Sequence, residues 1–304
     1  MSSAGNRLEQ VAFRGAVGAF GALPRAAALR AGAALGSLLY KVDVRHRATA
    51  LLNLRIAFPE RSEAEHREIL LESCRNLGRV GAEICHLPEL TAGNLSRYVG
   101  FRDRAAWDEA IRDVEQRGGL ILTGHFGNWE LLAYAHGLLG HPITLVHRPM
   151  RNPLVDAEIA RLRSGSGTRA LPKRAAAKEV LRTLRRKEIV VIPIDQNQSA
   201  GLGVFVDFFG KPACTTFGLA RLAKLTGVPV YPVFLVRQGS SEHHVIEILP
   251  RVEWIETGDS ERDIAANTQR YTEIFEQLLR RHPEQWIWFH KRWRTRPPGE
   301  AQFY

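Results

Sequence analysis

The chain has few cysteines and no long uncharged apolar run. Its 304 residues contain only Cys74, Cys85 and Cys214, with no Cys-x-x-Cys pair. This pattern predicts neither a disulfide framework nor a zinc site, and a reducing compartment is the simplest inference. No apolar run approaches the roughly 20 residues that a membrane-spanning helix needs, because Arg25 and Arg30 divide the apolar stretches near the start. Charged residues also interrupt the first stretch, so we predict no signal peptide.

Motifs of several enzyme classes are missing. The glycine-rich stretch 201–211 has neither Gly-x-Gly-x-x-Gly nor Walker spacing, so no nucleotide cradle is predicted. No Gly-x-Ser-x-Gly occurs, which argues against an acyl-enzyme on serine. His243 and His244 lack carboxylate or cysteine partners at ligand spacing, so we expect no metal.

The chain has fewer acidic than basic residues. The 42 lysines and arginines exceed the 32 acidic residues, which gives a net charge of +10. Such an excess implies an anionic partner, which could be nucleic acid, an anionic membrane face or an acidic protein. The length suits one large or two small domains with a sizeable core.

Short apolar runs alternate with helical patterns over most of the chain. We expect a helix at 62–86, which a capping box of Ser62 and Glu65 begins. We expect further helices at 103–117, 128–138, 152–163, 175–187, 215–226 and 264–281. We expect strands at 119–123, 143–147, 168–171, 188–194, 228–236 and 244–249. This alternation predicts an α/β fold, with a mixed central sheet flanked by helices, in a single domain over 46–304.

The first 45 residues differ from the rest. Residues 8–22 and 25–40 are two Ala/Gly-rich, weakly amphipathic helical stretches. We expect segment 1–45 to lie in a membrane interface, with Arg14 and Phe20 among the contacting residues. The alternative is an ordinary helical hairpin packed on the protein.

The stretch 119–130 organises the chain. A buried strand is expected to end at Gly124, and Asn128 can cap the helix that follows, so His125 lies in the turn between them. Ligands bind at this edge of open α/β sheets. Two helical residues five apart lie about 140° from each other, but a His125 in the turn can fold back onto Glu130. A carboxylate on one ring nitrogen would leave the other as a base. The alternative is a chance pair near a strand end.

Polar residues follow other strands at the same edge. Asp195 ends the strand over 188–194, and Arg148 follows the strand over 143–147. A buried carboxylate needs a partner, for which Arg148 and Arg163 are candidates. Asp195 as a turn residue and Arg163 as a solvated helix-end charge are the alternatives.

The end of the chain interleaves tryptophan with basic residues over 286–298. This pattern suits an anionic lipid interface, with Trp293 and Arg294 as candidate contacts. It also suits single-stranded nucleic acid, or a structural plug in which arginine stems pack on tryptophan.

The motif Gly-His-Phe-Gly-Asn-Trp-Glu at 124–130 resembles the signature of the bacterial lipid A late acyltransferases, the lauroyl/myristoyl transferase family. These belong to the wider lysophospholipid and glycerolipid acyltransferases with His-x-x-x-x-Asp/Glu. Further segments of this family resemble residues 53–60, 148–153, 204–210 and 286–293, with Asp207 where proline is common. The resemblance runs from about residue 15 to 297.

The resemblance implies a membrane-associated O-acyltransferase without a cofactor. Its donor would be an acyl carrier protein or CoA thioester, and its acceptor a hydroxyl of a lipid A precursor or related glycolipid. His125 would be the base and Glu130 would orient it. The expected substrate-binding residues are Arg148, Arg163, Asp195, Asn128 and Gly127. The acyl-pocket candidates are Phe126, Trp129, Phe205, Phe208 and Phe209, for which plain core packing is the alternative.

We expect a monomer, peripheral on the cytoplasmic face of the membrane, with no nucleic-acid partner. Relatives that acylate phosphatidylinositol mannosides share the motif, so that acceptor, or a lysophospholipid, stays open. Two rival classes are a lipid or thioester hydrolase using the same pair on water, and a non-catalytic basic protein binding membrane or nucleic acid.

Overall fold

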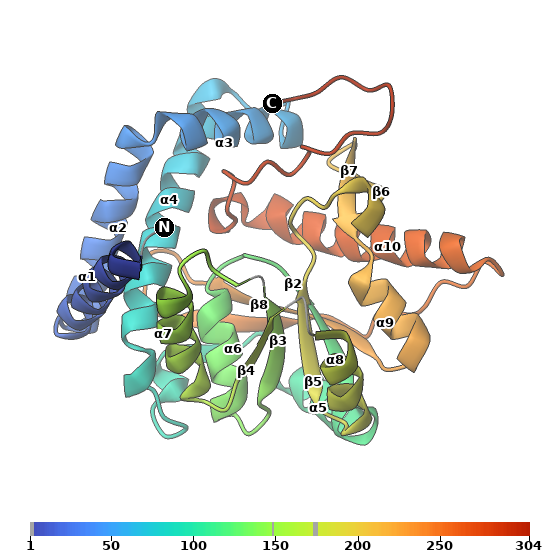
Figure 1. The fold of residues 1–304 in the computed structure, drawn as a ribbon, viewed down its shortest axis with the longest axis horizontal. Coiled ribbons are helices and arrows are strands. Elements are labelled where there is room, and N and C mark those ends of the chain that lie inside the picture. Colours follow the sequence, from blue (N-terminus) through green and yellow to red (C-terminus); the bar gives the residue numbers. More distant parts are fainter. Residues whose placement is uncertain (1–2, 148, 173–175) are drawn as a thin grey trace.

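A central sheet of seven strands organises the computed structural model, which describes residues 3–147, 149–172 and 176–304 (Figure 1). The strands are β1 (Val99–Phe101), β2 (Gly119–Thr123), β3 (Ile143–His147), β4 (Arg169–Pro172), β5 (Ile189–Pro193), β8 (Val230–Arg237) and β9 (His244–Ile248). Their order is β1-β9-β8-β2-β5-β3-β4, and β8–β9 is the antiparallel pair in it. The predicted mixed sheet is confirmed, although the short strand β1 was not expected.

Helices cover both faces of this sheet. They are α1 (Ser3–Gly21), α2 (Arg25–Val42), α3 (Val44–Ala57), α4 (Glu63–Cys85), α5 (Arg104–Arg117), α6 (Trp129–Leu138), α7 (Pro153–Ser164), α8 (Ala176–Arg185), α9 (Gly218–Thr226) and α10 (Ser260–Arg281). Successive residues of a strand point to opposite faces. Leu120 and Leu122 accordingly join a core with residues of α8, α9 and α10, whereas Ile121 joins a second core with residues of α5 and α6.

Local capping signals place the helix starts. The predicted capping box of Ser62 and Glu65 begins α4. Asn128 accepts a hydrogen bond from the backbone N–H of Leu131 at the start of α6. At the start of α7, the side chain of Asn152, just before Pro153, accepts from the backbone N–H of Leu154. These side chains satisfy N–H groups that have no partner inside the helix.

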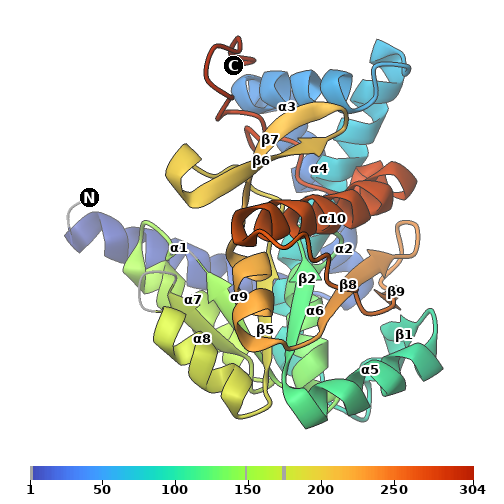
Figure 2. The same cartoon turned by 90° about the vertical axis from the view of Figure 1, so that its right-hand side faces the viewer.

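A hairpin replaces part of one predicted helix. Strands β6 (Gly203–Phe208) and β7 (Lys211–Thr216) pair antiparallel, so the helix expected over 215–226 begins only at Gly218. The hairpin packs on α10, and the C-terminal segment lies beside α3 (Figure 2). There the hydroxyl of Tyr304 donates to the side chain of Asn53.

The first two helices are docked on the rest of the protein. Gly36 of α2 lies so close to α4 that an added Cβ would be 2.1 Å from the carbonyl oxygen of Cys74. In α1, Arg14 pairs with Glu158 of α7. No helix within the described parts of the chain has both the length and the apolarity to cross a membrane. The boundary at residue 45 and the membrane contact of this segment stay predictions.

The tryptophan-rich C-terminal segment is largely interior. Trp286, Trp288 and Trp293 are at most 1% exposed, and the guanidinium of Arg292 lies 4.9 Å from the ring centre of Phe208. The prediction that Trp293 contacts a membrane is therefore wrong, because its indole completes the core under the hairpin. Arg294 is exposed, as an interface residue would be.

Candidate active site

An acid–histidine pair lies where β2 and β5 end. Asp195 accepts hydrogen bonds from Nδ1 of His125, with an N–O distance of 3.0 Å to Oδ1, and from the backbone N–H of His125 at 3.1 Å. The two strands are parallel neighbours in the sheet, with Thr123 opposite Pro193. Their carboxyl ends therefore meet at one edge, which is where the sequence predicted His125 and Asp195 to lie.

Trp286 is a third partner at this site, because it binds Asp195. Its indole Nε1–H donates to Oδ2 of Asp195 at 3.0 Å. Burial raises the pKa of Asp195, but the charge and hydrogen bonds of His125 and the bond from Trp286 outweigh it and hold the pKa below its ordinary value. Burial lowers the pKa of His125, but Asp195, helped by Glu130, raises it above 6.5. The carboxylate thus stabilises the protonated imidazole.

Glu130 has a different partner from the one expected. Its carboxylate accepts two hydrogen bonds from Arg163, at 2.7 Å from Nε and 2.5 Å from Nη2, and one from Nε1 of Trp129 at 3.1 Å. In the part of the chain that the structure describes, no hydrogen bond joins Glu130 to His125. The expected contact between them is therefore corrected, because Asp195 occupies Nδ1 of the ring. Arg163, one of the two arginines expected to pair with Asp195, pairs with Glu130 instead.

A cavity of about 400 Å³ opens beside the pair. His125, Trp129, Arg163 and Gln196 line it near the strand ends. The rest of its wall is mainly apolar, and its lining includes Ile121, Leu132, Ala133, Ile143, Leu145 and Val191. Because these residues belong to α6 and to the sheet face that α6 covers, the cavity extends beneath the helix. A mainly apolar cavity with polar residues at its mouth suits an aliphatic chain with a polar head.

The turn between His125 and Glu130 is held from behind. Gly127 has a φ of 57°, and a Cβ there would lie 1.8 Å from the carbonyl oxygen of Leu235, so only glycine fits. Its N–H donates to the carbonyl of Gln285 at 2.8 Å. The side chain of Asn128 is fully buried and bonds to Glu83 and Leu131. Neither residue lines the cavity, so their expected substrate contacts are corrected to a role in the turn.

Most of the aromatic pocket candidates belong to the core. Phe126, Phe208 and Phe209 are at most 5% exposed and pack in the same cluster as Trp286. Phe205 is half-buried and does not line the cavity, whereas Trp129 does. The acyl-pocket prediction is thus wrong for these four phenylalanines, because Phe126 of the turn and Phe208 and Phe209 of the hairpin pack into the core with the C-terminal tryptophans, and Phe205 does not reach the cavity.

Two residues at the site were not anticipated from the sequence, and one predicted site residue has no described position. Gln196 comes within 3.4 Å of Nδ1 of His125, and Trp286 binds Asp195. Gln196 follows Asp195 directly in the sequence, which was the available signal. A backbone pairing of Phe126 with Trp286, which no local pattern predicts, brings the latter to the site. Arg148 lies outside the described residues.

Fold and site together define an α/β protein with an acid–histidine pair at the mouth of an apolar cavity. The chain belongs to the bacterial lipid A biosynthesis acyltransferase family, whose model matches residues 11–295, and it is an acyltransferase. It is 29% identical over 292 residues to the lipid A biosynthesis lauroyltransferase of Escherichia coli K12, covering 93% of this chain and 90% of that protein. It is 28% identical to the palmitoleoyltransferase of the same strain, covering 90% and 87%. A lipid A biosynthesis acyltransferase of Haemophilus influenzae Rd is 30% identical, with 84% and 80% covered.

Proposed function

We propose that this acyltransferase moves a fatty acyl group from an acyl carrier protein or CoA thioester to a hydroxyl of a lipid A precursor or a closely related glycolipid. The observation that carries the proposal is the His125–Asp195 pair at the mouth of an apolar cavity. The acceptor class follows from the names of the relatives above, whose matched lengths cover nearly the whole chain.

His125 acts as the general base in this proposal. Asp195 holds the proton on Nδ1, which leaves Nε2 to take the proton of the acceptor hydroxyl. The hydroxyl oxygen then attacks the thioester carbonyl, and the tetrahedral intermediate collapses by expelling the thiolate. The imidazolium returns its proton to that sulfur. The pair acts directly on the acceptor, without an acyl-enzyme.

Arg163 supplies positive charge at the reacting carbonyl. Its guanidinium lines the cavity, and Glu130 fixes its orientation by a bidentate ion pair. Burial lowers the pKa of Arg163, but the hydrogen bond and charge of Glu130 raise it overall. A cation held in place before the reaction stabilises the oxyanion without rearranging in the transition state. Glu130 therefore acts in the proposal through Arg163 and not through His125.

The apolar part of the cavity takes the acyl chain. It runs beneath α6 over about two helical turns, from Trp129 to His136, which corresponds to roughly 10 Å. Along the sheet it reaches Ile143, the first residue of β3. A chain lying there places its thioester at the polar mouth.

The acyltransferase works at the membrane surface in this proposal, as a peripheral protein on the cytoplasmic face. The large apolar side chains of α1 to α3 that are more than 45% exposed are Leu8, Val11, Leu35, Leu38, Leu39, Val42 and Val44. Exposed Arg30, Lys41 and Arg45 accompany them. Apolar side chains flanked by basic ones bind anionic lipid interfaces. Arg14 pairs with Glu158 and Phe20 is half-buried, so these two residues are less suited to contact lipid than the exposed side chains above.

The test is transfer of a labelled acyl group from acyl carrier protein, and in parallel from CoA, to a lipid A precursor in mixed micelles. We expect wild type to label the acceptor, and His125→Ala to lose at least 10³-fold of the rate while staying folded. His46→Ala, at an exposed histidine, is the matched control. Release of free fatty acid without acceptor would identify a hydrolase. Equal rates for wild type and His125→Ala would remove the base from the proposal.

A further inference from the structure

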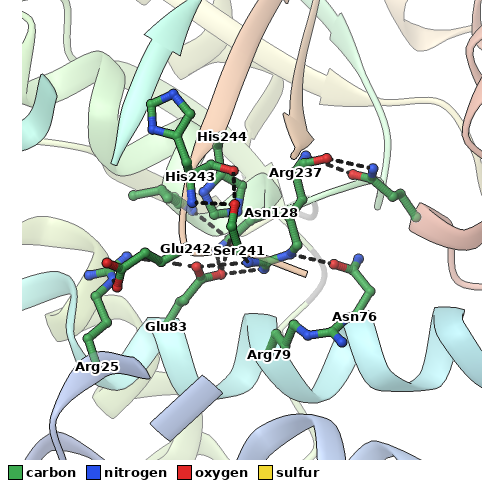
Figure 3. A network of polar contacts seen from close by, with 12 residues as sticks. Arg25, Asn76, Arg79, Glu83, Asn128, Arg237, Ser241, Glu242, His243 and His244 are labelled. Atoms are coloured by element: carbon green, nitrogen blue, oxygen red, sulfur yellow. Dashed lines mark hydrogen bonds and ion pairs between the residues drawn. The ribbon is translucent and has the colours of Figure 1, made fainter. Parts of the chain in front are cut away.

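A buried carboxylate behind the active site is surrounded by polar side chains from four different parts of the chain, two of which donate hydrogen bonds to it. Glu83 of α4 is 1% exposed, and it accepts from Nη1 of Arg237 at 3.0 Å and from Nη2 at 2.5 Å (Figure 3). It also accepts from Nδ2 of Asn128 at 2.7 Å. Arg25, at the start of α2, lies 3.8 Å away, and the ring of His244 lies 3.6 Å away. Burying such a charge is costly unless it is fully paired.

These bonds close into a ring around the turn that follows His125. The side chain of Gln285 bonds to both the backbone N–H and the carbonyl of Arg237, at 2.9 and 3.0 Å. The carbonyl of Gln285 accepts from the N–H of Gly127. Gly127 is followed by Asn128, which returns the ring to Glu83. Starting and ending at Glu83, the ring therefore passes through Arg237, Gln285, Gly127 and Asn128, and we call it the turn clamp.

The turn clamp connects the two halves of the site. His125 precedes the clamped turn, and Trp129 and Glu130 follow it. Trp286, next to Gln285, holds Asp195. A shift of the turn would therefore move the base relative to both Asp195 and the Glu130–Arg163 pair. Misplacement by about 1 Å can cost on the order of 10²-fold in rate.

We propose that Glu83 is a positioning residue for acyl transfer, and that it acts through Asn128 to fix the turn carrying His125 and Glu130. This inference rests on the proposed function for the role of His125 as base. Glu83 does not line the cavity and touches no reacting atom; it sets where the reacting side chains lie.

Asn128→Ser isolates the link. Serine keeps an oxygen that can cap the N–H of Leu131, but it lacks the amide that reaches Glu83, and Glu83 keeps Arg237 as its partner. Glu83→Gln removes the charge, and the double variant completes a cycle that measures whether the two residues act as one unit. Asn267→Ser is the matched control. Asn267 of α10 is also fully buried, and its side chain bonds to the backbone of Ile255.

We expect Asn128→Ser to lower kcat on the order of 10- to 100-fold while KM for donor and acceptor changes less than twofold. The double variant should be no slower than the slower single variant. Asn267→Ser should lower the Tm but leave kcat within twofold. A folded Asn128→Ser protein with wild-type kcat, or a rise in KM at constant kcat, would overturn the proposal. Strictly multiplicative effects in the cycle would do so as well.

Hydrogen exchange gives a measurement that does not depend on turnover. We expect amides of residues 126–130 to exchange faster in Asn128→Ser than in wild type, with the core strands unchanged. Unchanged exchange in that segment would contradict the turn clamp. If wild type transferred no acyl group to the chosen acceptor, the proposed function would fail, whereas the exchange difference would still decide whether Glu83 holds the turn.

Discussion

Asp195 accepts hydrogen bonds from two nitrogen atoms of His125, the ring Nδ1 and the backbone N–H, although 70 residues separate them in the chain. The backbone bond fixes where the turn begins, and the ring bond fixes which nitrogen faces the cavity. One carboxylate therefore sets both the position and the tautomer of the proposed base. The adjacency of β2 and β5 makes this possible, since Ile194 also donates its N–H to the carbonyl of Thr123 at 3.1 Å.

Replacing Asp195 by asparagine should therefore affect the rate more than binding. The amide can donate to Nδ1 of His125 and so favour the wrong tautomer, and it cannot stabilise the imidazolium. We expect kcat to fall on the order of 10²- to 10⁴-fold with KM little changed. Steady-state kinetics with a labelled donor measures this. Asp207→Asn, at an exposed aspartate of the hairpin, is the control. A tenfold rise in KM at unchanged kcat would instead make Asp195 a substrate-binding residue.

The pH dependence of the reaction should follow from the same pair. A general base is active when unprotonated, and Asp195 raises the pKa of His125 above 6.5. We therefore expect kcat/KM to rise with pH through an apparent pKa above 6.5. In Asp195→Asn the carboxylate no longer opposes the effect of burial, so the residual activity should rise at lower pH than in wild type. An identical acid limb in both proteins would mean that another group controls it.

Local signals in the sequence predicted the elements around the site but not all of their partners. The apolar run before Gly124, the cap at Asn128 and the box at Ser62 each act within a few residues, and each lies where it was expected. The pairing of His125 with Asp195 depends on strand order, which no local pattern encodes. Glu130 looked like the partner of His125 because it is near in sequence, but the helix directs it toward Arg163.

The hairpin was missed because its turn lacks the usual residues. Strands β6 and β7 are joined by Phe209 and Gly210, both with positive φ, at 54° and 70°. Such two-residue turns usually carry Asn-Gly or Asp-Gly, and Phe-Gly gives no such signal. Phe209 tolerates this backbone while its ring packs against Phe58 and Phe208 at 5.3 and 4.8 Å. Tertiary packing therefore determined a turn that propensity did not predict.

The rate of acyl transfer should be sensitive to changes in the Glu130–Arg163 pair even when the positive charge at residue 163 is kept. Arg163→Lys retains a cation but loses the two parallel N–H donors that hold it on Glu130. Because a misplaced cation cannot stabilise the oxyanion, we expect kcat to fall on the order of 10²-fold. The exposed pair Arg104–Asp108 supplies the control, and Arg104→Lys should leave kcat unchanged. Wild-type kcat in folded Arg163→Lys would exclude Arg163 from the oxyanion site.

Buried histidines should limit stability in acid. His136 of α6 is 1% exposed, and its burial, with a small contribution from His141, lowers its pKa from 6.5 to about 3. The unfolded chain binds the proton more readily, so stability is complete above pH 6.5 and falls as the pH drops toward 3. At pH 5 the loss is about 2 kcal/mol from this residue alone. Denaturant unfolding gives the free energy of unfolding at pH 7 and at pH 5. The difference between the two values should be smaller in His136→Phe, whose ring can still pack on Trp107, than in wild type. An unchanged difference would contradict the assignment.

Chain-length preference should respond to Ala133, whose methyl group lies on the wall of the cavity beneath α6. Leucine there would fill part of the space that the distal carbons of the acyl chain occupy in our proposal. Overpacking costs about 1–3 kcal/mol in stability, so the variant should fold but prefer shorter donors. Ile143→Val, farther along the cavity, removes one methylene and should shift the preference toward longer chains.

Competition between donors of different length in one reaction gives the ratio of kcat/KM values directly. Because each methylene in an apolar pocket changes that ratio by roughly 10- to 200-fold at most, opposite shifts in the two variants would locate the chain in this cavity. Equal preferences in both variants and wild type would place it elsewhere.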